Sequence, residues 1–146
     1  MNFELFLIDR MNLVFMRTSG RVDLHGLMET QRFLAEETLL KSSLDVLIDA
    51  REIDFSIRAE QVISAGRALR ASRASHDVKR LAIVVKDDLA FGITRMFMVF
   101  RQIGNEYSVH RTIPLAIEWL GLPAAAEEAI TCQKSPQRCS LKRRAS

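Results

Sequence analysis

The chain has 146 residues, of which 48% are hydrophobic and 27% charged, values typical of one globular domain and of neither a fibrous nor a disordered protein. Residues 1–123 hold 16 Lys and Arg against 16 Asp and Glu, whereas residues 124–146 hold five against two, which predicts a folded domain over 1–123 and a disordered basic tail over 124–146. No apolar run reaches the roughly 18 residues of a membrane span, and the start, MNFELFLIDR, is not a signal peptide, so we expect a cytoplasmic protein.

The first elements in chain order are predicted to be a β-hairpin and a helix. Apolar runs at 3–8 and 13–17 flank the polar corner at Asp9 and Arg10, and the second run ends at 18–20. Asp23 is placed to cap a helix over about 24–40, because its carboxylate can accept from backbone N–H groups of the first turn.

Two aliphatic runs, 44–50 and 81–85, are predicted to be strands covered on both faces. The first leads through a loop over 51–55 to Ser56, which is placed to cap a second helix. On that helix Gly66 lies on the apolar stripe, where its lack of a side chain permits close approach to the sheet.

The last elements are predicted to be a helix over about 89–103, a strand over 107–111 and a short final helix. Thr112 is placed to cap the final helix, and Gly121 supplies a stop that tolerates the left-handed conformation. The order ββαβαβαβα predicts an α/β fold with a central mixed sheet of four to five strands and helices packed against it.

This order resembles the STAS superfamily, and within it the SpoIIAA-like (STAS/SEC14-like) domains. The motifs that carry the resemblance are a strand ending at Gly20, LIDA at Leu47–Ala50, RLAIVV at Arg80–Val85 and AIEWLG at Ala116–Gly121. The resemblance implies a non-enzymatic regulatory module that binds partner proteins, as anti-sigma factor antagonists do, in a bacterial cytoplasm. It also implies an alternative, a SEC14-like carrier or sensor of a small apolar or lipid-like ligand in a groove beside the helix at 89–103.

In STAS domains a serine at the start of the second helix is phosphorylated, and Ser56 is the hydroxyl at that place in this chain. Phosphorylation there would add about −1.5 to −2 charge beside a helix N-terminus, which favours an anion. A simple capping role is the other interpretation of Ser56.

Four charged residues near the end of the 44–50 strand form a second candidate site, for a ligand or a partner. Open α/β sheets place ligands at the carboxyl ends of their strands. The alternative is that the two carboxylates bond loop amides or pair with the arginines. The four residues are Asp49, Arg51, Asp54 and Arg58.

The helix at 89–103 carries more apolar residues than one face against a sheet requires. Phe91 and Met98 are predicted on its far side, with Phe97 on the near side. Such a surplus has three possible outcomes: burial under the final helix and tail, a homodimer or partner surface, or an apolar ligand pocket.

No catalytic, metal or cofactor motif is found in the sequence. His25, His76 and His110 lie on separate elements, and Cys132 and Cys139 lack histidine neighbours, so no metal site is predicted. Basic residues between 67 and 80 are diluted by acidic ones and lack interleaved aromatics, so the nucleic-acid signal is weak. We expect a binding protein without a cofactor.

Overall fold

The computed structural model describes residues 1–36, 44–71, 79–101 and 106–132. They contain a five-stranded sheet with the strand order β1-β2-β3-β4-β5. β1 and β2 pair antiparallel, and all other neighbours pair parallel, which confirms the predicted mixed sheet. The strands are β1 (Asn2–Ile8), β2 (Leu13–Val22), β3 (Asp45–Phe55), β4 (Arg80–Val84) and β5 (Glu106–His110).

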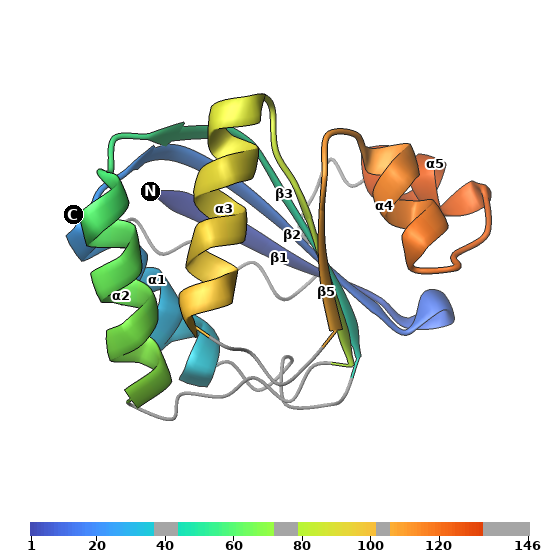
Figure 1. The fold of residues 1–146 in the computed structure, drawn as a ribbon. Coiled ribbons are helices and arrows are strands. Elements are labelled where there is room, and N and C mark those ends of the chain that lie inside the picture. Colours follow the sequence, from blue (N-terminus) through green and yellow to red (C-terminus); the bar gives the residue numbers. More distant parts are fainter. Residues whose placement is uncertain (37–43, 72–78, 102–105, 133–146) are drawn as a thin grey trace.

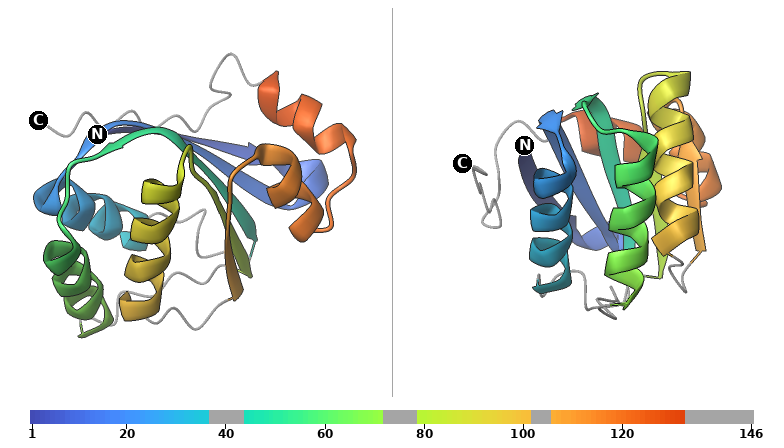
Figure 2. Two further views of the ribbon diagram at one scale, coloured as in Figure 1. Left: turned by 45° about the horizontal axis from the view of Figure 1, so that its top comes forward. Right: turned by 60° about the vertical axis from the view of Figure 1, so that its left-hand side comes forward.

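Helices cover both faces of this sheet (Figures 1 and 2). Three longer helices lie on one face: α1 (Leu24–Glu36), α2 (Ala59–Ala71) and α3 (Asp88–Arg101). The other face carries α4 (Ile113–Trp119) and α5 (Ala125–Thr131), while the short turn η1 (Asp9–Met11) joins β1 to β2. Each parallel pair requires a crossover connection, and α1, α2 and α3 lie in three such connections.

Side-chain alternation along the strands gives the fold two hydrophobic cores. Leu5 and its paired residue Met16 face the α1–α3 layer, whereas Phe6 and its paired residue Phe15 face α4 and α5. The rings of Phe6 and Phe15 stack with their centroids 5.9 Å apart. A sheet buried on both faces explains why the strands read as nearly continuous apolar runs.

Three predicted helix signals are confirmed. The Asp23 carboxylate accepts a hydrogen bond from the Gly26 N–H at 2.8 Å at the start of α1. The Thr112 hydroxyl accepts from the Leu115 N–H at 3.4 Å at the start of α4. Gly121 follows α4 with φ of +64°, the left-handed conformation in which glycine is favoured.

The predicted loop over 51–55 is wrong, because β3 continues to Phe55. The extension pairs with the second half of β2, which itself runs past Gly20 to Val22. The predicted cap at Ser56 is also wrong. Helix α2 begins at Ala59, and it is the Arg58 carbonyl that accepts from the N–H groups of Gln61 and Val62.

The predicted disordered tail over 124–146 is wrong in its first part, because Ala125–Thr131 forms α5. This helix buries Ala126, Ala129 and Ile130, whose spacing of three and four residues places them on one helical face. Cys132 follows it as an exposed free thiol. The rest of the predicted tail, including Cys139, lies outside the described residues.

Gly66 permits close approach to another helix and not, as predicted, to the sheet. A Cβ atom at Gly66 would lie 2.9 Å from the Cβ of Phe100 and 3.1 Å from the backbone nitrogen of Arg101. Both residues belong to α3, so the absence of a side chain at Gly66 sets how closely α2 and α3 pack.

A candidate ligand cavity between the sheet and three helices

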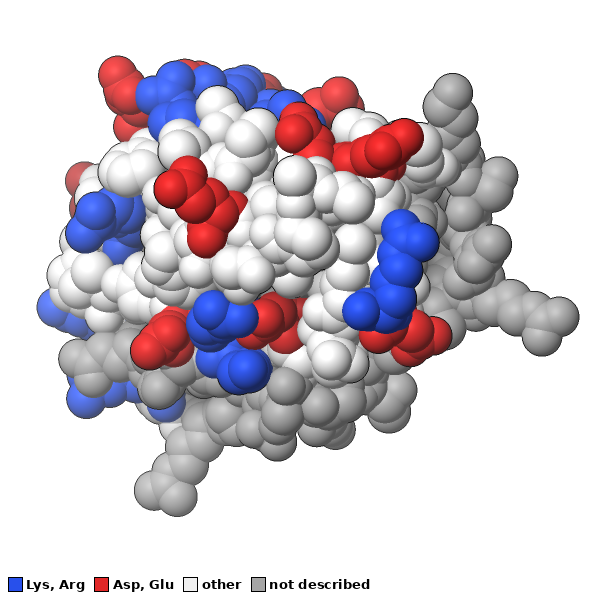
Figure 3. Space-filling view, turned by 90° about the vertical axis from the view of Figure 1, so that its right-hand side faces the viewer, with Lys and Arg blue, Asp and Glu red and all other residues white. Residues whose placement is uncertain are grey.

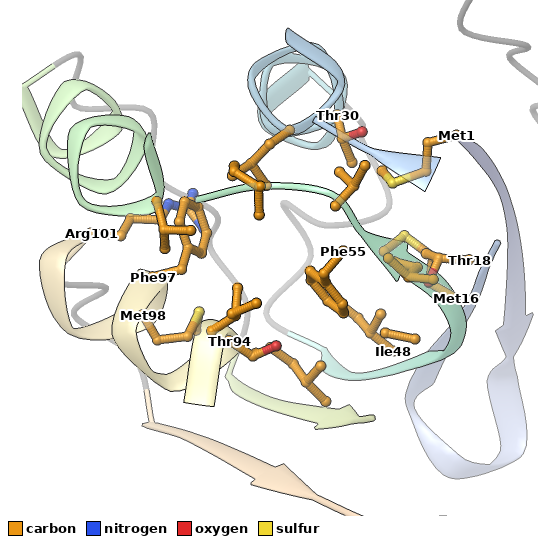
Figure 4. A pocket seen from close by; sticks show the side chains of 18 of the residues that line it. Met1, Met16, Thr18, Thr30, Ile48, Phe55, Thr94, Phe97, Met98 and Arg101 are labelled. Carbon is orange, nitrogen blue, oxygen red and sulfur yellow. The ribbon is translucent and has the colours of Figure 1, made fainter. Parts of the chain in front are cut away.

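A cavity of about 130 Å³ lies between the sheet and the α1–α3 layer (Figure 4). Its walls are almost entirely apolar. The sheet supplies Met16, Ile48 and Ile83, while α3 supplies Phe97 and Met98. An apolar cavity of about 150 Å³ is large enough to bind benzene, so this one suits a small molecule with an apolar body.

A β-bulge in β3 allows both halves of the strand to line this cavity. Arg17 pairs with Asp49 but Ser19 pairs with Glu52, so β3 has one more residue than β2 at this point. Because of the extra residue, the side chains that face the cavity change from even-numbered to odd-numbered positions along β3. Residues 46, 48 and 50 face the cavity before the bulge, and residues 53 and 55 face it afterwards.

Thr18 is placed opposite the bulge and bonds to it. Its hydroxyl donates to the backbone carbonyl of Asp49 at 2.9 Å, and the side chain is buried at 3% exposure. The bulge interrupts the regular ladder, so this side chain supplies a hydrogen bond to the backbone at that point.

We therefore expect Thr18→Val to lower the free energy of unfolding by about 1–2 kcal/mol, because valine keeps the volume but removes the donor to a buried carbonyl. Urea denaturation measures the change. Thr18→Ser, which keeps the hydroxyl and loses a methyl group, is the control and should lose less. A Thr18→Val protein as stable as the unchanged one would contradict a role for this bond.

The cavity face of α3 follows the helical period. Thr94, Phe97, Met98 and Arg101 are separated by three, one and three residues, so they share one face of the helix. All four are buried and line the cavity. The helix begins where the Asp87 carboxylate accepts from the Ala90 N–H at 2.8 Å, which stabilises its first turn.

Arg101 is the functional candidate that the sequence interpretation missed. Its side chain is 5% exposed, and the cost of burying its charge lowers the pKa of Arg101 to about 10. The signal that could have found it is its spacing, since it follows Phe97 by four residues and Thr94 by seven. A charged residue on the apolar stripe of a helix is unusual.

Two of the cavity threonines already bond to backbone carbonyls. Thr18 donates to Asp49, and the Thr30 hydroxyl donates to the Gly26 carbonyl at 2.8 Å within α1. Each of these hydroxyls has its proton committed, and among the described residues that line the cavity Arg101 has the one charged side chain.

The four charged candidates near the end of β3 do not form one site. Asp49 and Arg51 are joined by a bidentate contact, with distances of 2.9 Å (Nε to Oδ1) and 2.8 Å (Nη2 to Oδ2). Burial alone would raise the pKa of Asp49, but the hydrogen bonds from Arg51 hold it below its ordinary value. This confirms the interpretation that the arginine pairs with the carboxylate.

Asp54 and Arg58 are exposed and lie further along the chain, Asp54 within β3 and Arg58 just before α2. No hydrogen bond or ion pair among the described residues links either side chain to the Asp49–Arg51 pair. Asp49 is two residues beyond Leu47 and points to the same side of the sheet, because side chains alternate along a strand. Leu47 packs in the core under α4 and α5, so the Asp49–Arg51 pair lies on the face of the sheet opposite the cavity. Ser56 lies between β3 and α2 and is partly exposed. Its phosphorylation stays a prediction.

The predicted position of Met98 on the far side of its helix is wrong. Met98 is 2% exposed and Phe97 8%, and both line the cavity. Phe91 is partly buried, with the Arg95 guanidinium 5.8 Å from its ring centroid. The exposed apolar residues of α3 are instead Leu89 and Val99. A partner surface at Phe91 stays a prediction, but Met98 does not contribute to it.

His110 lies on the face of the sheet opposite the cavity, beside the Trp119 ring with centroids 6.0 Å apart. Burial lowers the pKa of His110, and its Nε2 atom has no hydrogen-bond partner among the described residues. No group of His, Cys, Asp and Glu in the described segments is arranged to hold a metal ion. His110 therefore has no neighbours for metal chemistry in that part of the chain.

On the side that carries α4, acidic and basic side chains alternate without a basic stripe (Figure 3). Arg80 of the predicted basic region is paired with Asp45, which balances its charge. None of the helices in the described segments is both long and apolar enough to cross a bilayer.

Comparisons with known proteins find a structural likeness. No protein-family model matches the sequence, and no curated protein matches it significantly. The structure is similar to the crystal structure of an uncharacterized protein of the DUF3478 family from Shewanella loihica PV-4. The TM-score is 0.47 and the identity 20%, over 74% of this chain and 83% of that one. That protein is described as having a SpoIIAA-like fold, the fold that the sequence resemblance implies.

Proposed function

We propose that this chain is a binding protein, not an enzyme, and that it holds a small apolar ligand in the cavity between β2–β4 and the α1–α3 layer. The observation that carries the proposal is the cavity itself, about 130 Å³ and lined mainly by apolar side chains. Well-packed interiors contain few voids larger than a water molecule, so a cavity of this size and polarity favours an apolar occupant over water.

The arrangement of the cavity walls supports the same proposal. The bulge in β3 departs from regular pairing, and its effect is to turn Ile53 and Phe55 toward the cavity. Departures of this kind are common next to functional sites. A partner-regulated role through Ser56, implied by the resemblance, remains a prediction that no contact in the structure favours over the ligand-binding role.

Methionine methyl groups provide a direct test of the proposal. The chain has six methionines, which divide into those lining the cavity and those elsewhere. Toluene, a small neutral probe, is added to protein labelled with ¹³C at the methionine methyl groups, and NMR chemical shifts are measured. The expected shifts are confined to Met1, Met16 and Met98, with Met11, Met28 and Met96 as internal controls.

A cavity-filling variant completes the test. Ala50→Leu adds three carbons at a cavity residue that is 4% exposed, so we expect it to weaken toluene binding at least tenfold. Ala71→Leu makes the same change at an exposed position of α2 and should bind toluene as the unchanged protein does. Equal shifts in all six methyl groups, or toluene binding that survives Ala50→Leu, would contradict the proposal.

A further inference from the structure

Thr94 differs from the other threonines of the described helices in the bonding of its hydroxyl. A threonine inside a helix commonly donates to the backbone carbonyl four residues before it. Thr30 donates to the Gly26 carbonyl in this way at 2.8 Å, and Thr131 donates to the Glu127 carbonyl at 2.8 Å. The hydroxyl of Thr94 makes no such bond, and no other group of the described residues is bonded to it.

This unpaired hydroxyl lies at the cavity. Thr94 is 8% exposed and lines the cavity, and Figure 4 shows its side chain on the cavity side of α3. The large majority of buried polar side-chain atoms have a hydrogen-bond partner, because an unpaired one is destabilising. The proton of the Thr94 hydroxyl is therefore available to a molecule that occupies the cavity.

The other cavity hydroxyls can accept a hydrogen bond from a ligand but have no proton to donate. Thr18 and Thr30 both donate to backbone carbonyls, and their oxygens keep lone pairs. Arg101 takes part in an interaction within the protein. Among the three threonines of the cavity, Thr94 is the one whose hydroxyl can donate to an oxygen of a ligand.

We infer that the ligand is a small neutral molecule with one acceptor oxygen, as in a ketone, that accepts a hydrogen bond from Thr94. This inference rests on the proposed function. Phe97 and Met98 follow Thr94 by three and four residues, so they lie one turn further on the same helix face and contact the apolar body. One hydroxyl satisfies one neutral oxygen, whereas an ion would lose far more hydration among apolar walls than one hydroxyl replaces.

Cyclohexanone and methylenecyclohexane are a matched pair of probes, because they share a ring and differ by an oxygen in place of a CH₂ group. Each is titrated into the full chain, and its affinity is taken from the NMR shifts of the ¹³C-labelled methyl groups of Met16 and Met98. Transfer of both probes from water to hexadecane gives the affinity ratio expected without a hydrogen bond. We expect the unchanged protein to favour cyclohexanone by about three- to tenfold more than this ratio.

Thr94→Val keeps the volume and removes the hydroxyl, so it should lower the affinity for cyclohexanone about three- to tenfold relative to methylenecyclohexane. Thr94→Ser should keep the ratio of the unchanged protein. Thr131→Val, the same change at an exposed position of α5, is the matched control and should also keep the ratio.

Stability without ligand gives a second readout, which a structural role of the hydroxyl would move in the opposite direction. Thr94→Val should have a urea midpoint equal to or above that of the unchanged protein, because it removes an unpaired polar group from apolar surroundings. Thr18→Val should have a lower midpoint, since the hydroxyl of Thr18 is bonded.

The outcomes separate the inference from the proposed function. An affinity ratio that Thr94→Val leaves unchanged, with both probes still bound, overturns the role of Thr94 and leaves the cavity as the binding site. A lower urea midpoint of Thr94→Val also overturns it, because the hydroxyl would then be bonded in the ligand-free protein. If this variant fails to fold, the comparison with hexadecane decides on the unchanged protein alone.

Two further probes complete the test. Pentanoate is an anion with as many non-hydrogen atoms as cyclohexanone, and it should bind more weakly. Tighter binding of pentanoate would overturn the neutral class of ligand. Absence of binding by every probe, toluene included, removes the proposed function and the inference together.

Discussion

Replacement of Arg80 by methionine is expected to destabilise the fold by about 2–4 kcal/mol, because it leaves a buried carboxylate without its cation. Arg80 Nε donates to Asp45 Oδ1 at 3.1 Å, and Nη2 donates to Oδ2 at 2.7 Å. The same Nη2 donates to the Leu120 carbonyl at 3.0 Å, just after α4. One side chain thus joins β3, β4 and the end of α4, and methionine replaces only its apolar stem.

Chemical denaturation of Arg80→Met measures this loss. Arg70→Met is the matched control, because Arg70 is exposed on α2, and its change should stay within about 0.5 kcal/mol. The double variant Asp45→Asn with Arg80→Met should lose less than the sum of the two single changes, since the two side chains interact directly. Additive losses, or an Arg80→Met variant no weaker than Arg70→Met, would show that the pair is not coupled.

Gly66→Ala is the second change with a large expected effect, a loss of about 1–3 kcal/mol of stability. The new methyl group would lie 2.9 Å from the Cβ of Phe100, a distance that Cβ atoms essentially never show. The backbone of α3 is also in the way, with the nitrogen of Arg101 at 3.1 Å, so the helices must move apart. Because Phe97 and Met98 lie on the same helix and line the cavity, toluene binding should weaken as well.

Gly92→Ala provides the opposite expectation within the same structure. A Cβ atom at Gly92 meets nothing within 4 Å, and the residue is in the middle of α3. Alanine is favoured over glycine in a helix interior by about 1 kcal/mol, so this variant should be more stable than the unchanged protein. Thermal and urea denaturation of the two variants compare the signs directly. Stabilisation by Gly66→Ala would mean that the helices are not in close contact there.

The local signals in the sequence were sufficient for the order of the elements. The hairpin, the cap at Asp23 and the stop at Gly121 depend on residues within a few positions of one another, and the structure has all three. Helix α5 was missed although its signal is also local. Ala126, Ala129 and Ile130 have helical spacing, whereas the polar and basic composition of residues 124–146 as a whole favours disorder, and the two signals conflict.

The cavity depends on pairings that no local pattern contains. β3 extends to Phe55 because β2 continues beside it, and its bulge is defined by residues more than 30 positions apart. Helix α3 has apolar residues around most of its circumference, so the period alone did not select the buried face. The predicted near side left Met98 outside, whereas Met98 is 2% exposed and Leu89 is the residue that faces solvent.

The bulge in β3 makes the length of this segment adjustable at one point. Removing one residue between 49 and 52 would restore simple alternation beside β2, and the pairs of Ile53 with Gly20 and of Phe55 with Val22 would be kept. Ile53 and Phe55 would still face the interior, and Asp54 would stay on the opposite face. Homologous chains that bind in this cavity should therefore vary in length by one residue at the bulge, while they keep apolar residues at the positions of Ile53 and Phe55.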